Sequence, residues 1–129
     1  MRNLLILVAT LGVVGCGGSG AHSTSPFIGT YAGTWVAPSL NDNGTAILTI
    51  ASDGSLTGTL HDDVSLSDAT VSGTLSSSGV THATVVYAGP ATSTLTGTVA
   101  LGSQGQLSGN LIQTEGGNSV GVTFALVKQ

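Results

Sequence analysis

The densest group of polar side chains that could do chemistry is His61-Asp62-Asp63, with Asp68 five residues further on. Carboxylate oxygens suit a divalent cation, and a histidine beside a carboxylate can act as a base. However, the group falls between two predicted strands, and it lacks the alternating oxygen ligands and closing glutamate of a calcium loop. We therefore interpret His61, Asp62 and Asp63 as part of a solvated loop.

Catalytic groups normally appear as clustered, convergent titratable residues. Apart from the group around His61, the sequence contains no such cluster, and no histidine–acid pair is tied by a motif to a particular serine. A phosphate-binding loop with its lysine is also missing from the sequence. We expect a protein without enzymatic activity, without a cofactor and without a bound metal.

Four aromatic residues are candidates for a ligand pocket: Tyr31, Trp35, Tyr87 and Phe124. The interior of a small barrel is a common place for an apolar ligand. The alternative is that these side chains fill the barrel as core, because eight strands leave an interior just wide enough for side chains. The scarcity of aromatic residues favours core packing, and a cavity beside Trp35 would favour the pocket.

The elements that must position these residues are strands. Beyond residue 26, apolar residues alternate with Thr and Ser in short runs separated by turn signals such as Ser52-Asp53-Gly54. Such a pattern is typical of an antiparallel all-β domain. It predicts eight strands, at about 28–36, 44–51, 55–62, 68–75, 81–88, 93–101, 106–113 and 119–128.

A repeat of apolar, small polar, glycine, small polar and apolar residues runs through these strands. It occurs at 56–60, 71–75, 95–99 and 107–111, with an aromatic version at 31–35. Alternation places the apolar residues and the central glycine on the inner face. The glycines indicate either tight curvature or room for Tyr31, Trp35 or Phe124. Both reasons predict a small antiparallel up-and-down β-barrel, with a β-sandwich as the alternative.

Part of the domain resembles a known family of barrels. Gly33-Thr34-Trp35, the strand at 47–50 and the hairpin at 52–60 are similar to the opening three strands of the avidin and streptavidin family. The Gly-x-Trp pattern is also similar to that of the lipocalins. This resemblance implies a calycin-like, eight-stranded barrel.

The resemblance does not extend to the residues that form the biotin site of the avidin family. Ala37 stands where the family has Asn, Leu60 where it has Tyr, and Asp62 where it has Ser. The family also walls its pocket with several tryptophans, whereas Trp35 is the only one here. We therefore expect no biotin binding.

The first sixteen residues have the features of an export signal. Arg2 precedes an uncharged apolar run, 4–14, which is too short to span a bilayer core that needs about 20 residues. Val13-Val14-Gly15-Cys16 resembles the lipobox of bacterial lipoproteins. The resemblance implies that 1–15 is removed and that Cys16 receives a diacylglyceryl thioether. Because Gly17 is not Asp, it also implies the outer membrane in a cell with two membranes.

Composition limits the partners of the mature chain. Lys128 is its only Lys or Arg, against five Asp and one Glu, which gives a formal charge of −5 after Arg2 is removed. Binding to nucleic acid needs clustered basic residues, so that partner class is excluded. Residues 16–26 read as the lipidated cysteine followed by a Gly/Ser tether, and 27–129 as the barrel domain.

We thus expect a lipid-anchored envelope protein whose barrel binds a small apolar ligand. In the alternative, the barrel has a solid core and contacts an envelope protein or a glycan. The loops at 37–43, 61–67, 88–92 and 114–118 would make those contacts, since function concentrates on the connections of a rigid scaffold.

Overall fold

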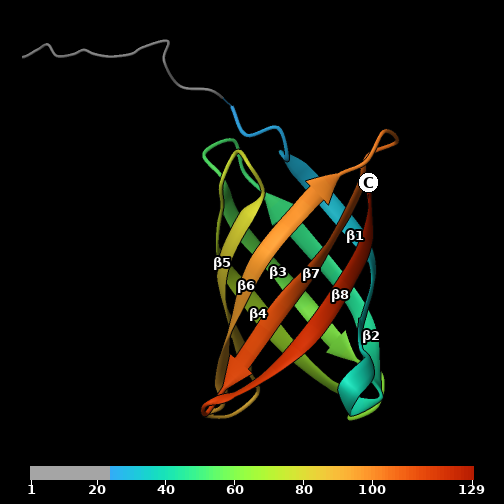
Figure 1. Cartoon of the computed structure of the whole chain (residues 1–129), viewed down its shortest axis with the longest axis vertical. Coiled ribbons are helices and arrows are strands. Elements are labelled where there is room, and N and C mark those ends of the chain that lie inside the picture. Colours follow the sequence, from blue (N-terminus) through green and yellow to red (C-terminus); the bar gives the residue numbers. More distant parts are fainter. Residues whose placement is uncertain (1–23) are drawn as a thin grey trace, which may run out of the picture.

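The alternating residues form eight antiparallel strands within residues 24–129, the part of the chain that the computed structural model describes (Figure 1). Each strand pairs with the next, and β8 pairs with β1, so the sheet closes on itself. The strands are β1 (Gly29–Ala37), β2 (Asp42–Ile50), β3 (Ser55–Asp62), β4 (Ser67–Leu75), β5 (Val80–Tyr87), β6 (Thr92–Leu101), β7 (Gln106–Glu115) and β8 (Asn118–Lys128). One turn of 3-10 helix, η3 (Pro38–Leu40), connects β1 to β2.

The all-β prediction is confirmed, and the architecture is an up-and-down barrel, not a sandwich. Every predicted strand boundary lies within two residues of the observed one. The predicted signal segment, Cys16 and the first part of the tether lie outside the described residues. Between residues 24 and 129, no helix is long and apolar enough to cross a membrane.

The side chains of the five-residue repeats point alternately into the barrel and out to solvent, as the sequence pattern predicts. In β3, Leu56 and Leu60 are buried whereas Thr57 and Thr59 are exposed, and the same pattern recurs in β4 and β7. Inward side chains from all eight strands join into one apolar core. Burial of that core is the main favourable term in folding such a barrel.

The inward glycines let neighbouring strands approach closely. A Cβ atom on Gly33 would lie 2.2 Å from the carbonyl oxygen of Ala125 on β8, and one on Gly58 would lie 2.2 Å from that of Ile47 on β2. The obstacle is backbone, so curvature explains these glycines better than room for an aromatic ring. Gly44 meets both kinds of obstacle, because a Cβ there would collide with the carbonyl oxygen of His61 and would also lie 2.8 Å from the indole nitrogen of Trp35.

The barrel end at which the described chain begins is filled. The Ser25 N–H donates to the carbonyl oxygen of Ser52 in the β2–β3 turn, and Phe27 is buried with its ring beside Gly79 of the β4–β5 turn. The Tyr31 hydroxyl donates to the carbonyl oxygen of Phe27 at 2.9 Å. The apolar space left inside this half of the barrel is about 20 Å³, about the minimum for a single water. Ser25, which the sequence analysis assigned to the tether, is therefore part of the folded structure.

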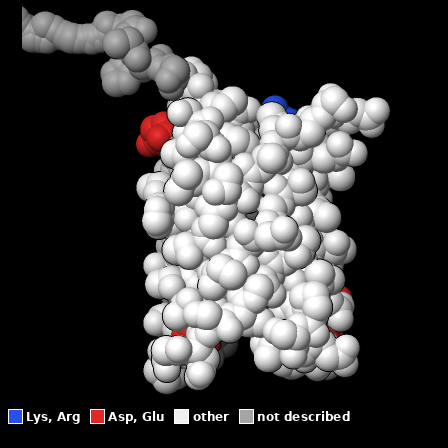
Figure 2. Space-filling view, in the orientation of Figure 1, with Lys and Arg blue, Asp and Glu red and all other residues white. Residues whose placement is uncertain are grey.

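Small and hydroxyl-bearing side chains make up much of the outer wall, interrupted by exposed aliphatic residues such as Ile47, Ile112 and Val127. One row follows the strand register once around the barrel: Thr30, Thr49, Thr57, Ser72, Thr84, Thr94, Thr114 and Ser119. Acidic and basic side chains lie at the two ends of the barrel, and the wall between them carries none on the face shown in Figure 2. This uncharged and largely polar surface suits the face of the sheet that is exposed to water.

Candidate ligand-binding site

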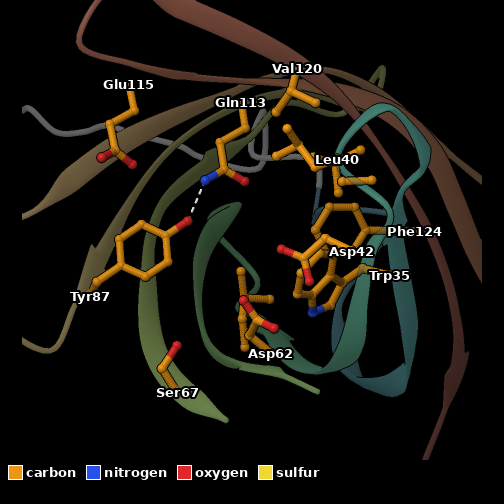
Figure 3. Close-up of a pocket in the computed structure, with 13 residues that line it drawn as sticks. Trp35, Leu40, Asp42, Asp62, Ser67, Tyr87, Gln113, Glu115, Val120 and Phe124 are labelled. Atoms are coloured by element: carbon orange, nitrogen blue, oxygen red, sulfur yellow. Dashed lines mark hydrogen bonds between the residues drawn. The ribbon is translucent and has the colours of Figure 1, made fainter. Parts of the chain in front are cut away.

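The end of the barrel away from residue 24 is hollow. It contains a cavity of about 170 Å³, lined by residues from β1, η3, β2, β3, β4, β5, β7 and β8 (Figure 3). The four loops named as candidate contact surfaces all lie at this end, because they follow β1, β3, β5 and β7. Three of the four aromatic pocket candidates, Trp35, Tyr87 and Phe124, line the cavity.

Aromatic and aliphatic side chains form the floor of the cavity. Trp35 on β1 is paired in register with Phe124 on β8, and both are buried. The Trp35 ring is held on its other side, where its Nε1 donates to the carbonyl oxygen of His61 at 3.2 Å. Leu60 completes the floor from β3. The sequence places Gly44 opposite Trp35, and this leaves room for the indole.

A hydrogen-bond network fixes the polar wall. The side-chain amide of Gln113 on β7 donates to the Tyr87 hydroxyl on β5, and the two side chains meet at the edge of the cavity (Figure 3). The same amide nitrogen also donates to Ser93 Oγ at 3.0 Å. Ser93 is almost fully buried, so this network ties three strands together beneath the mouth.

Carboxylates form the rim. Asp42 at the start of β2, Asp62 at the end of β3 and Glu115 at the end of β7 all line the cavity. Asp62 Oδ1 accepts the N–H groups of Val64 and Ser65, each at 2.8 Å, and so caps the β3–β4 turn. Asp42 Oδ1 accepts the N–H of its neighbour Asn43 at 2.9 Å.

The pKa values of the two rim aspartates, Asp42 and Asp62, are shifted in opposite directions. Burial raises the pKa of Asp42, and the adjacent Asp62 carboxylate raises it further, against the opposing effect of the Asn43 N–H. Burial also raises the pKa of Asp62, but hydrogen bonds from Ser65 and Val64 outweigh it, so its pKa lies below the ordinary value. The ionised form is therefore favoured at Asp62 and disfavoured at Asp42.

Tyr31, the fourth aromatic candidate, does not reach the cavity. It is fully buried at the filled end, where its hydroxyl is bonded to Phe27. The reason is its position near the start of β1, whereas Trp35 lies near the end of the same strand. Tyr31 belongs to the core, and the other three candidates border the cavity.

The His61-Asp62-Asp63 cluster is divided by the pleat of β3. Asp62 faces the cavity, whereas His61 faces solvent, with Nδ1 2.7 Å from Asp68 Oδ1 and Nε2 3.7 Å from Asp63 Oδ1. The hydrogen bond to Asp68 is the main reason that the pKa of His61 is raised. Within residues 24–129, no group of three or more His, Cys, Asp or Glu side chains is placed to hold a metal ion.

One short motif went unnoticed in the sequence. Gly117-Asn118-Ser119-Val120-Gly121 matches the Gly-x-Ser-x-Gly spacing of a hydrolase nucleophile elbow. That elbow connects a strand to a helix, whereas this stretch consists of the last residue of the β7–β8 turn and the start of β8. Ser119 is exposed on the outer wall, and its hydroxyl is 2.8 Å from that of Thr114. The match is therefore coincidental.

Three residues of the site, Asp42, Gln113 and Glu115, were not among the predicted pocket residues, although Asp42 and Glu115 fall in the candidate loops at 37–43 and 114–118. A usable signal was present, because Gln113 and Glu115 continue the inward alternation of Leu107 and Leu111 on β7. Asp42 likewise continues the inward series of β2. Following each inward series to the end of its strand would have placed polar groups at one barrel mouth.

Comparison with known proteins finds no matching family model, no matching curated protein and no matching solved structure. The closed eight-stranded antiparallel barrel is compatible with the calycin-like fold that the resemblance implied. What the protein does must therefore be argued from the cavity itself.

Proposed function

We propose that the protein is a lipid-anchored envelope protein that binds a small ligand in the cavity and catalyses no reaction. The observation that carries the proposal is the contrast between the two barrel ends. One end is filled by Phe27 and Tyr31, whereas the other keeps a cavity of about 170 Å³ over an aromatic floor. A barrel that served only as a solid module would gain stability by filling that space.

The size of the cavity limits the ligand. An engineered apolar cavity of about 150 Å³ holds benzene, and sites for drug-sized ligands start at about 300 Å³. A ligand with one ring or a compact aliphatic body therefore fits over Trp35 and Phe124. Leu40 on η3, which is 63 % exposed, borders the same cavity and offers an apolar contact at the mouth.

The position of the cavity fits attachment to a membrane. The tether predicted at 16–26 enters the barrel at the filled end, where Ser25 is bonded to Ser52. A lipid on Cys16 would therefore hold the filled end toward the membrane and direct the mouth away from it. If residues 17–24 behave as a flexible chain, they span about 15 Å in r.m.s. terms, and the mouth at the opposite end stays open to dissolved ligands.

Two observations support a role in binding over one in catalysis. The histidine nearest to the cavity, His61, points away from it and is engaged by Asp68. The polar groups of the wall, Gln113 and Tyr87, are committed to each other. This arrangement holds a surface in place and leaves no base–nucleophile pair in the cavity.

Trp35 is the only tryptophan, so its fluorescence reports on the cavity floor without a label. We expect saturable changes in Trp35 emission when one-ring compounds are titrated into the full-length exported protein. Leu40→Ala should weaken binding without loss of folding, because the side chain is mostly exposed. If no compound in a broad panel changes Trp35 emission, the proposal is refuted and contacts through the loops are favoured.

A further inference from the structure

We infer that the ligand of the cavity is a small organic cation: a protonated amine carried on a compact apolar or aromatic body. The inference rests on the proposed function and adds the chemical class of the ligand. Its basis is that Asp42, Asp62 and Glu115 border the same cavity as Trp35 and Phe124.

Among the residues that the structure describes, 24–129, the rim carboxylates have no cationic partner. Lys128 is the only Lys or Arg among residues 24–129, and it lies at the filled end, close to Gly29 and Gly105. The ion pairs found in the described part of the chain both involve His61, on the outer face of β3. Because Asp42 is half-buried beside the Asp62 carboxylate, its ionised form is disfavoured, and a cationic ligand would stabilise that form.

The charge distribution of the whole barrel favours the same class of ligand. Of the six acidic residues, five lie at or beside the mouth, and only Asp53 lies at the filled end. The wall between the two ends carries no Lys or Arg. A cavity mouth that carries charge of one sign above a low-dielectric interior attracts oppositely charged ligands and raises their local concentration.

The floor favours an organic cation over a metal ion. The ring surfaces of Trp35 and Phe124 offer apolar contact to the hydrocarbon body of such a ligand. The negative π-faces of the same rings attract its ammonium group. One oxygen of Asp62 is already used by two backbone N–H groups. Carboxylates spread over β2, β3 and β7 suit a molecule that spans the cavity, since a divalent ion needs its oxygens at close range.

This arrangement predicts that cation binding depends on pH. The titratable groups that face the cavity are Asp42, Asp62, Glu115 and Tyr87, and His61, Asp63 and Asp68 lie outside it. Asp42 has the raised pKa because it is buried beside Asp62. Its negative charge is therefore lost at a higher pH than that of an ordinary aspartate, and affinity for a cation falls as that charge is lost.

The test compares three ligands of equal size by calorimetry on the full-length exported protein in a neutral detergent. They are 2-phenylethylammonium, the neutral 2-phenylethanol and the anionic phenylacetate. We expect the ammonium to bind about tenfold more tightly than the alcohol, the scale of one charge-assisted hydrogen bond, and the anion to bind most weakly. Asp42→Asn and Asp62→Asn should each reduce that preference, whereas the matched Asp53→Asn should not.

The outcomes separate the two claims. Equal affinity for the ammonium and the alcohol, unaffected by Asp42→Asn and Asp62→Asn, would refute the preference for a cation. It would still support ligand binding in the cavity. Binding of calcium chloride without binding of the ammonium would also overturn it, in favour of a metal. No binding of any of the three, with Leu40→Ala indistinguishable from the natural protein, would overturn the proposed function as well.

Discussion

At the scale of single residues, the pleat of a strand decides which polar side chains share a site. His61 and Asp62 are neighbours in the sequence, yet one faces solvent and the other faces the cavity. Asp62 instead meets Asp42 and Glu115, which come from the ends of other strands. A group that looks like a base or a metal site in the sequence is therefore split into a surface ion pair and part of a cavity rim.

The opposite pKa shifts of the rim aspartates predict opposite effects on stability. Asp42 has a raised pKa in the fold, so the stability it contributes is present below its ordinary pKa and lost as pH rises through the raised value. Asp42→Asn should therefore raise the Tm at pH 7, by about 2–4 °C for a change near 0.5 kcal/mol. Thermal unfolding without ligand measures this.

Asp62→Asn should have the opposite effect. Its pKa is lowered in the fold, so its stabilising effect is present above the ordinary pKa and lost as pH falls through the lowered value. The Tm at pH 7 should fall, and the difference from the natural protein should shrink toward pH 2–3. If both variants shift the Tm in the same direction at pH 7, the electrostatic description of the rim is wrong.

His61 allows a separate check on the outer face. The Asp68 carboxylate raises the pKa of His61 above its ordinary 6.5. Asp68→Asn should lower that pKa, and the stabilising effect of the protonated ring, present below 6.5, should disappear as pH rises through the folded value. An NMR titration of the imidazole follows this directly. A pKa unchanged by Asp68→Asn, as in the control Asp53→Asn, would refute the assignment.

At the scale of elements, glycine sets how closely the strands pack. The five-residue repeat puts a glycine on the inner face of β1, β3, β4, β6 and β7. At Gly33, an added methyl group would collide with backbone atoms of β8, which cannot move aside as a side chain can. The glycines of the repeat are therefore requirements of the closed sheet.

Two glycine-to-alanine changes test this with an internal control. Gly33→Ala should lower the free energy of unfolding by about 1–3 kcal/mol, the usual cost of overpacking. Gly121→Ala on β8 meets nothing within 4 Å and should be neutral or stabilising by up to about 1 kcal/mol. Urea unfolding monitored by Trp35 fluorescence gives both values. Similar losses for the two variants would show that the cost is not steric.

Most of the fold could be predicted from the sequence because period-two alternation and turn residues are local signals. The inner and outer faces of β3, with Leu56 in and Thr57 out, follow from alternation alone. The common end of Trp35, Asp42 and Glu115 follows from the up-and-down order of the strands, but the cavity does not, because its presence depends on the register and packing of side chains across strands. Register is a property of pairs of strands, and no single stretch of sequence encodes it.

At the scale of the whole molecule, the two ends of the barrel differ in packing and in charge. The filled end carries Phe27, Tyr31 and Lys128, and the open end carries the cavity and five carboxylates. The described chain enters at the filled end. Anchoring through residues that precede this point would give the cavity a fixed direction.

The proposed anchor has its own test. Cys16 is the only cysteine, so Cys16→Ser removes the only sulfur that could carry a thioether. In cells, this variant should incorporate no labelled palmitate, whereas Gly17→Ala should be labelled like the natural protein. Lipid anchoring would be ruled out if the label persisted in Cys16→Ser.

The claim that the open end binds a small molecule is tested most directly by native mass spectrometry of the protein released gently from its own envelope. We predict one discrete extra mass, lost on denaturation and reduced in Asp42→Asn, whose identity is a one-ring or compact amine. A mass equal to the acylated polypeptide alone, together with Trp35 emission that no small cation alters, would contradict the account.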